Sequence, residues 1–189
     1  MRSRGRHHLS AVLAWRWVAL SALGAASVVA CSHPGRGAAV PANGCAPALN
    51  ERLDSRSTVH LFPSAPEPKY LTDPPTSGPH RLGPPFRGVV NTPIPRSSQV
   101  AMLESGFVIV QSRVLPASQA AGVDRLAADL VTVAPPAGPL PSAIVVTAWT
   151  WKLECGSADP PALAAIHAFI ATHQGVGFAG NIPPTTVTS

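Results

Sequence analysis

Residues 143–151, AIVVTAWTW, decide the fold more than any other part of this 189-residue chain. The stretch is rich in β-branched and aromatic residues, which favour strands, so we predict a strand over its whole length. Trp149 and Trp151 alternate with smaller residues, so we expect both indoles on one side of that strand. On that side the indoles would be part of the hydrophobic core or, alternatively, line a ligand groove.

The chain before this strand supplies its first partners. Residues 107–110, FVIV, are fully apolar and predict a strand at the centre of a sheet. A short helix is expected just before it, capped by Ser98 and ended by Gly106. Further upstream, residues 88–91 (GVVN) and 59–62 (VHLF) are candidates for short strands.

A second helix is predicted to begin near Ser118. Its apolar residues recur at helical spacing, and Arg125 and Asp129 fall four apart on the other face as an expected ion pair. Residues 130–134, LVTVA, then predict another strand. The apolar stripe of this helix consists of Val123, Leu126, Ala127 and Leu130.

The last helix has the clearest boundaries. Asp159 suits its N-cap, Pro160 its first position and Gly175 its end. Its buried stripe is expected to consist of Leu163, Ile166 and Ile170. The order of elements predicts an α+β fold, a small mixed sheet with about three helices and a long Pro-rich N-terminal segment. Ten prolines and three glycines in residues 63–95 mark that segment as extended and rich in turns.

The first thirty residues are typical of an export signal. A basic start with three arginines is followed by an uncharged apolar run over residues 18–30. Thirteen helical residues span about 20 Å, which is short of the roughly 30 Å hydrocarbon core of a bilayer. We therefore predict a signal peptide at 1–30, a tether at 31–48, a single α+β domain at 49–180 and a disordered tail at 181–189.

The end of that signal, Val28-Val29-Ala30-Cys31, resembles the lipobox of bacterial lipoproteins. The resemblance implies that Cys31 becomes a lipidated N-terminus, which places the domain on the outer face of the bacterial cytoplasmic membrane. A Leu at Val28 would be more typical. An ordinary cleaved signal, which would make the protein secreted, and an uncleaved anchor extended by residues 11–17 remain the alternatives.

The predicted export affects both the net charge of the mature protein and the expected redox state of its cysteines. Four of the 14 Lys and Arg lie in the signal, so ten face nine acidic residues and the mature formal charge is +1. A nucleic-acid partner is therefore not expected, because phosphate binding needs a concentrated basic surface. Cys45 and Cys155 remain as a pair in an oxidising compartment and are predicted to form a disulfide. A metal or redox role for them is the alternative.

At residues 74–80, PPTSGPH, followed by a Pro-rich turn and Gly88-Val89, the chain resembles an uncharacterised bacterial family, "domain of unknown function 3105". Members of that family continue with a helix bearing HNLEHG, a strand reading GVVI and a later strand ending in TAW. The matching stretches are residues 101–106 (AMLESG), 107–110 (FVIV) and 147–149 (TAW). The resemblance covers about residues 59–174.

The helical histidines of that motif share one face, a spacing that suits a metal ion. In this chain their positions hold Ala101 and Ser105, so only His80 and Glu104 remain at matching places. Those two, with His60 as a recruit, are the candidates for a degenerate metal site, although the sequence alone assigns no metal. The alternative is that His80 and Glu104 make hydrogen bonds that fix a turn and a helix end.

No catalytic motif is recognisable, because the chain has no G-x-S-x-G, P-loop or G-x-G-x-x-G in its usual context. We therefore expect that the protein is not an enzyme and that it binds no cofactor. The sequence predicts a lipid-anchored envelope protein that acts as a non-catalytic binding or interaction module. Its partners would be the membrane and an unknown envelope protein or small ligand. A metal-binding or metal-delivering envelope protein is the alternative function.

Overall fold

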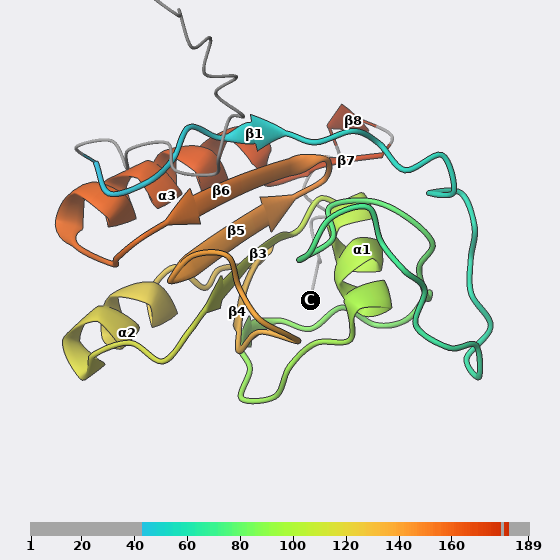
Figure 1. Ribbon diagram of the computed structural model, residues 1–189, viewed down its shortest axis with the longest axis horizontal. Helices are drawn as coiled ribbons and strands as arrows, with labels where there is room; N and C mark the ends of the chain where they lie inside the picture. Colours follow the sequence, from blue (N-terminus) through green and yellow to red (C-terminus); the bar gives the residue numbers. More distant parts are fainter. Residues whose placement is uncertain (1–42, 179, 182–189) are drawn as a thin grey trace, which may run out of the picture. The chain divides into compact units, whose positions relative to one another are not determined.

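The computed structural model describes residues 43–178 and 180–181. The expected export signal, Cys31 and almost all of the expected tail lie outside these residues. Three helices and a six-stranded mixed sheet confirm the α+β class (Figure 1). The sheet runs in the order β1-β6-β5-β3-β4-β2. In chain order, its strands are β1 (Leu49–Asn50), β2 (Gly88–Val89), β3 (Val108–Ser112), β4 (Val131–Ala134), β5 (Ile144–Ala148) and β6 (Trp151–Cys155).

The sheet is parallel on one side and antiparallel on the other. β4 pairs in parallel with β2 and β3, whereas β5 is antiparallel to both β3 and β6, and β1 is antiparallel to β6. β3 therefore joins the two halves, and its first four residues are all buried. The central position that we predicted for the FVIV stretch is confirmed.

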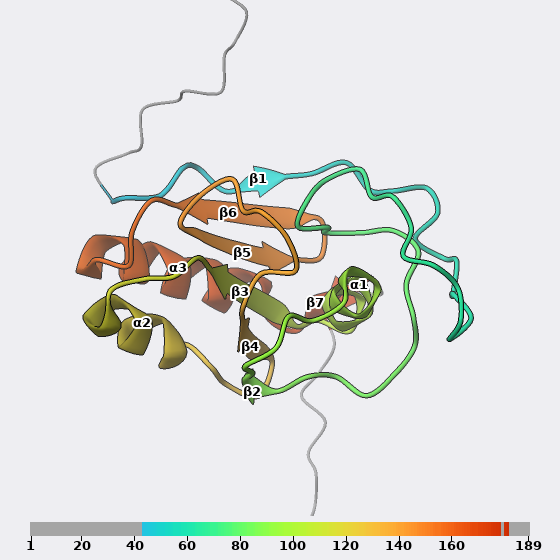
Figure 2. The same cartoon turned by 60° about the horizontal axis from the view of Figure 1, so that its bottom comes forward.

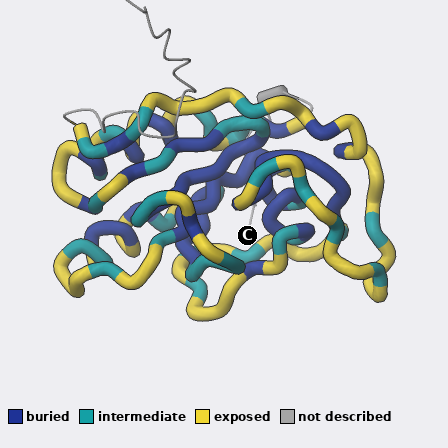
Figure 3. Tube along the Cα trace, in the orientation of Figure 1, coloured by how far each residue is buried: buried dark blue, intermediate teal, exposed yellow. Residues whose placement is uncertain are grey.

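Helices cover both faces of this sheet. α2 (Ala117–Asp124) and α3 (Pro160–His173) pack on one face, and α1 (Arg96–Glu104) packs on the other. Figures 1 and 2 show α2 and α3 together at one end of the sheet and α1 at the other. Strand side chains alternate between the two core clusters, and Figure 3 shows burial concentrated in the central strands.

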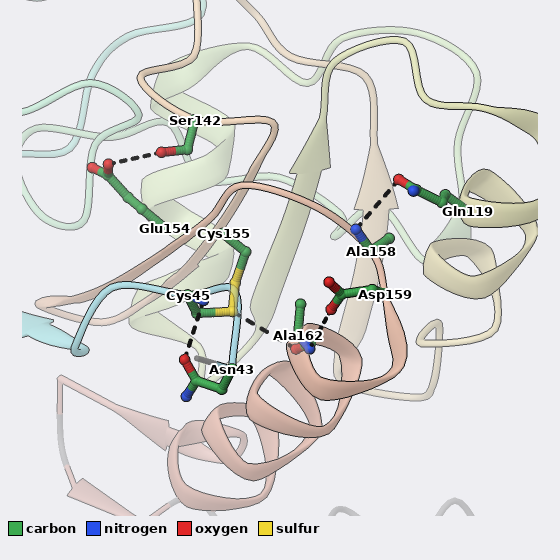
Figure 4. The surroundings of a disulfide bond; sticks show 9 residues. All are labelled: Asn43, Cys45, Gln119, Ser142, Glu154, Cys155, Ala158, Asp159 and Ala162. Atoms are coloured by element: carbon green, nitrogen blue, oxygen red, sulfur yellow. Dashed lines mark hydrogen bonds between the residues drawn. A yellow bond between two sulfur atoms is a disulfide. The ribbon is translucent and has the colours of Figure 1, made fainter. Parts of the chain in front are cut away.

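The predicted limits of α3 are confirmed. The Asp159 carboxylate accepts a hydrogen bond from the Ala162 amide at 2.9 Å, and Pro160 occupies the first helical position. Beside this cap, Cys45 and Cys155 form the predicted disulfide (Figure 4). Both cysteines are buried, and the amide of Ala46 donates to the carbonyl oxygen of Glu154 at 2.8 Å.

The prediction of one strand over residues 143–151 was wrong, because the stretch contains a tight turn. β5 ends at Ala148, and β6 begins at Trp151. Thr150 takes a positive φ of 59° at this turn. Trp149 consequently packs in the cluster beneath α1, whereas Trp151 packs against the cluster beneath α2 and α3. The two indoles therefore do not share a face.

Three smaller expectations also need correction. Ser98 does not cap α1, because the helix already begins at Arg96 with Pro95 as its N-cap. α2 ends at Asp124, so Arg125 and Asp129 lie beyond it and are not ion-paired in the described part of the chain. Leu126 still reaches the core, through the turn after the helix. Residues 59–62 make a single bridge at His60 instead of a strand.

The last described residues form a small hairpin. It consists of β7 (Val176–Gly177) and β8 (Gly180–Asn181), and it lies against the end of α1. The Phe178 amide donates to the Glu104 carbonyl oxygen at 3.1 Å. None of the described helices is long and apolar enough to cross a membrane.

Candidate metal centre

Three potential metal ligands from distant parts of the chain meet in one place. One ligand atom each from His60, His80 and Glu104 lie within 4.8 Å of one another. His60 and His80 come from the irregular segment between β1 and β2, and Glu104 is the last residue of α1. These are the three candidates that the sequence offered, and the structure brings all of them together.

Backbone pairing places the two histidines side by side. His60 and His80 form an isolated parallel bridge. The His80 amide donates to the Val59 carbonyl oxygen at 3.1 Å, and the Leu61 amide donates to the His80 carbonyl oxygen at 2.8 Å. Directly paired residues point their side chains the same way, so the imidazoles are neighbours, with ring centroids 4.9 Å apart.

The turn before His80 is held from several sides. The Asp54 amide donates to the hydroxyl of Ser77 at 3.0 Å, and the Tyr70 hydroxyl donates to the Pro79 carbonyl oxygen at 2.9 Å. Burial raises the pKa of Tyr70, which keeps its phenol protonated as a donor. Gly78 has a φ of +132°, and a Cβ there would lie 3.0 Å from the Tyr70 ring. His80 therefore sits on a well-packed turn.

A defined helix end positions Glu104. Gly106 has a φ of +80°, its amide donates to the Leu103 carbonyl oxygen, and the Phe107 amide donates to the Met102 carbonyl oxygen. This is a Schellman motif, so the expectation that Gly106 ends the helix is confirmed. The carboxylate of Glu104 consequently lies at the negative end of the helix dipole, where a nearby cation is favourable.

The imidazole of His80 leaves one nitrogen aimed into the cluster. Nδ1 lies 3.1 Å from the Gly78 carbonyl oxygen, which can only accept, so Nδ1 carries the proton. Nε2 lies 2.8 Å from the Glu104 carboxylate but makes no hydrogen bond within the described residues. The side chain of His80 is fully buried. If the imidazole is neutral and protonated at Nδ1, the Nε2 lone pair faces a carboxylate oxygen, and either a proton or a metal ion between the two atoms relieves that contact.

The negative charge of the Glu104 carboxylate is available to such a cation. Of the ion pairs in the described residues, the only one that involves Glu104 is the contact with His80, so no Lys or Arg pairs with its carboxylate there. Ligand atoms of a tetrahedral zinc ion lie about 3.3 Å apart, from bond lengths of about 2.0–2.2 Å. Movements of about 1.5 Å or less would bring all three ligand atoms to that spacing.

The structure also supports part of the alternative interpretation, in which His80 makes hydrogen bonds that fix a turn. The hydrogen bond from Nδ1 to Gly78 does fix the turn, as that alternative expects. A carbonyl acceptor on the second ring nitrogen is, however, also the usual way in which a metal-binding histidine is oriented. The two roles therefore use different nitrogens of one ring.

In the family motif HNLEHG, two helical histidines occupy the positions that match Ala101 and Ser105. In this chain those two residues bring no ligand to the cluster. They line a small cleft beside α1 together with Arg81 and Ser98. The Ser105 hydroxyl donates to the Ala101 carbonyl oxygen at 3.0 Å. Arg81 is committed elsewhere, since it pairs with Glu67 at 2.7 Å.

One buried ionic network was missed from the sequence. The Lys152 ammonium lies 2.8 Å from a carboxylate oxygen of Glu51, and both side chains are more than nine-tenths buried. The other oxygen of Glu51 accepts from the hydroxyls of Thr72 and Thr76 at 2.6 and 2.7 Å. The network ties the segment that carries His80 to β6. A lone lysine in a strand gives no signal of burial, because most lysines are solvated.

Comparisons with known proteins give one family and no closer relative. No curated protein and no solved structure matches the chain. A family model described as "Protein of unknown function (DUF3105)" matches residues 64–180, which include His80, Glu104 and the strands β2 to β7. His60 lies just outside the matched range. The chain therefore belongs to the DUF3105 family, as its PPTSGPH motif predicted.

Proposed function

We propose that this protein is an exported metal-binding protein that holds a divalent transition-metal ion between His60, His80 and Glu104. The observation that carries the proposal is the convergence of these three side chains. It favours the alternative function, a metal-binding protein, over the interaction module that the sequence analysis placed first, and it involves no catalytic step.

The ligand set narrows the class of metal. Imidazole nitrogens suit zinc, copper, nickel and iron, whereas magnesium and calcium prefer sites made of oxygen atoms. Two imidazoles with one carboxylate form a recurrent zinc set. Zinc is therefore the first ion to test, and copper, which binds such ligands more tightly in general, is the second.

The test is calorimetric titration of the purified full chain with zinc and with copper. We expect one ion per chain in the parent, at least tenfold weaker binding in Glu104→Gln, and loss of binding in His80→Ala. Glu104→Gln keeps the shape of a partly exposed side chain, so its effect does not depend on a folding defect. His167→Ala removes an exposed histidine of α3 as the matched control and should bind as the parent does.

Two results would contradict the proposal. One is the absence of stoichiometric binding in a folded parent protein. The other is binding that Glu104→Gln, His60→Ala and His167→Ala leave equally strong, since an ion elsewhere on the chain would then explain the titration. In either case the structural alternative for His80 would stand.

We further propose that the domain is lipid-anchored through Cys31 on the outer face of the cytoplasmic membrane. The lipobox-like sequence supports this, and the Cys45–Cys155 disulfide suits an oxidising compartment. Two acyl chains hold a protein on a bilayer durably. Cys31→Ser should move the protein from the membrane fraction into the medium, with Cys155→Ser as a cysteine control that stays on the membrane. Continued retention of Cys31→Ser would indicate an uncleaved anchor.

A further inference from the structure

The three ligands of the candidate metal centre differ sharply in exposure. The side chain of His80 is completely buried, and that of Glu104 is 23% exposed. His60 is an exposed residue. Solvent, or another molecule, therefore reaches the cluster from the side of His60. His80 and Glu104 form its inner part.

No fourth His, Cys, Asp or Glu of the described residues joins the cluster. Within them, the only group of three or more His, Cys, Asp or Glu side chains close enough to hold a metal ion is this one. Structural zinc sites are closed by four protein ligands, whereas sites with three keep an exchangeable position for water or another ligand. An ion held here by three ligands would have its open position on the exposed side.

Two exposed apolar residues stand close in sequence to the paired histidines, and no further His, Cys, Asp or Glu joins the cluster among the described residues. Phe62 is 81% exposed and Leu82 is 67% exposed. Each follows one of the paired histidines by two residues. An incoming donor atom therefore has to compete with His60 alone among the ligands on this side.

We propose that the protein hands its metal ion to an acceptor by direct ligand exchange on the His60 side. This inference rests on the proposed function. A nitrogen or sulfur donor of the acceptor first bonds to the ion at its open position, and the bond from the ion to His60 then breaks. His80 and Glu104 release the ion last. The ion stays divalent throughout, His60 leaves as neutral imidazole, and an acceptor thiol gives its proton to solvent.

The order of these events is measurable with a chromogenic chelator, 4-(2-pyridylazo)resorcinol, as the acceptor. The zinc-loaded full chain is mixed with increasing chelator, and the rate of colour formation is followed by stopped flow. Direct exchange predicts a rate that rises in proportion to chelator concentration. A rate that is independent of chelator concentration means that the ion dissociates first, and it would overturn the inference.

Two matched substitutions locate the open position. Leu82→Trp adds bulk at an exposed residue two positions after His80 and should slow the exchange severalfold without changing zinc affinity. Val114→Trp adds the same bulk at a fully exposed residue that follows β3 and should leave the rate unchanged. Equal rates in both variants would show that exchange does not use the His60 side.

The design separates the two proposals. Failure of the parent chain to load zinc or copper would refute the proposed function and this inference with it. A chain that loads one ion but releases it at a rate independent of the chelator would refute the exchange step alone. Loading is therefore measured in the same preparation before each kinetic run.

Discussion

The two faces of the central sheet are built from different kinds of residues. The face beneath α2 and α3 is apolar throughout, and it includes the disulfide. The face beneath α1 has a smaller apolar cluster and a row of buried polar side chains that alternate with apolar ones along the strands. These polar strand residues are Gln111, Thr132, Thr147 and Lys152.

This difference determines how each face responds to substitution. Apolar burial contributes roughly 25 cal/mol per Å² and needs no hydrogen-bond partner, so the face beneath α2 and α3 stabilises the fold without specific polar contacts. Buried polar groups cost free energy unless each is paired. On the α1 face Thr132 and Lys152 are paired, whereas the Gln111 amide and the Thr147 hydroxyl make no hydrogen bond within the described residues. The candidate metal centre lies on the side of α1. Substitutions on the two faces should therefore have different consequences.

The largest effect is expected from the disulfide on the apolar face. Cys155→Ser opens a loop with a sequence separation of 110 residues. The chain-entropy model gives about 4.7 kcal/mol for a loop of about 100 residues. We expect a loss of that order in the free energy of unfolding, measured by urea titration, and a Cys45 that reacts with thiol reagents once the chain unfolds. A parent protein whose Cys45 reacts equally would contradict the disulfide.

The next largest effect is expected from the polar face. Lys152→Met leaves the carboxylate of Glu51 buried without its cation, which typically costs about 3–5 kcal/mol. Lys69→Met removes an exposed lysine instead and should change the free energy of unfolding by less than about 0.5 kcal/mol. Similar losses from both substitutions, measured by thermal and urea unfolding, would mean that the Glu51–Lys152 pair adds nothing specific.

The smallest effect is a pH dependence on the apolar face. His173 lies against Trp151 and Phe169, with ring centroids 4.8 and 4.4 Å away, and burial lowers its pKa. The unfolded chain then binds the proton more readily, so the stabilisation is present above the unfolded pKa of about 6.5 and is lost as pH falls through the folded pKa.

His173→Phe removes this titration and keeps an aromatic ring. The variant should lose less stability than the parent between pH 7 and pH 5, measured by urea unfolding at each pH. Parallel pH profiles would show that His173 titrates alike in both states. His167→Phe is the control, because His167 is exposed on the same helix.

Elements with local signals could be predicted, and those that depend on distant contacts could not. The cap at Asp159, the helix end at Gly106 and the central strand FVIV each carry their own signal and are confirmed. The turn at Thr150 was missed because it has no glycine, proline or asparagine. The early end of α2 was missed because its apolar spacing continues to Leu126, which reaches the core through a turn instead.

The candidate site divides in the same way. Its members could be named from a family motif and from the few histidines available, but their convergence could not be derived. His60 and His80 are twenty residues apart across a Pro-rich loop, and only the bridge between their backbones brings the rings together. The burial of Glu51 and Lys152 likewise arises from pairing between the N-terminal segment and β6.

The hairpin of β7 and β8 restricts which residue can stand at position 177 of this chain. A Cβ at Gly177 would lie 2.0 Å from the Glu104 carbonyl oxygen, so no other residue fits while β7 lies against the end of α1. Glycine at this position is thus a signature of the docking itself and is independent of any ligand. We expect family members that share this docked hairpin to keep a glycine here even where their histidines differ, so this position would align them independently of the ligand positions.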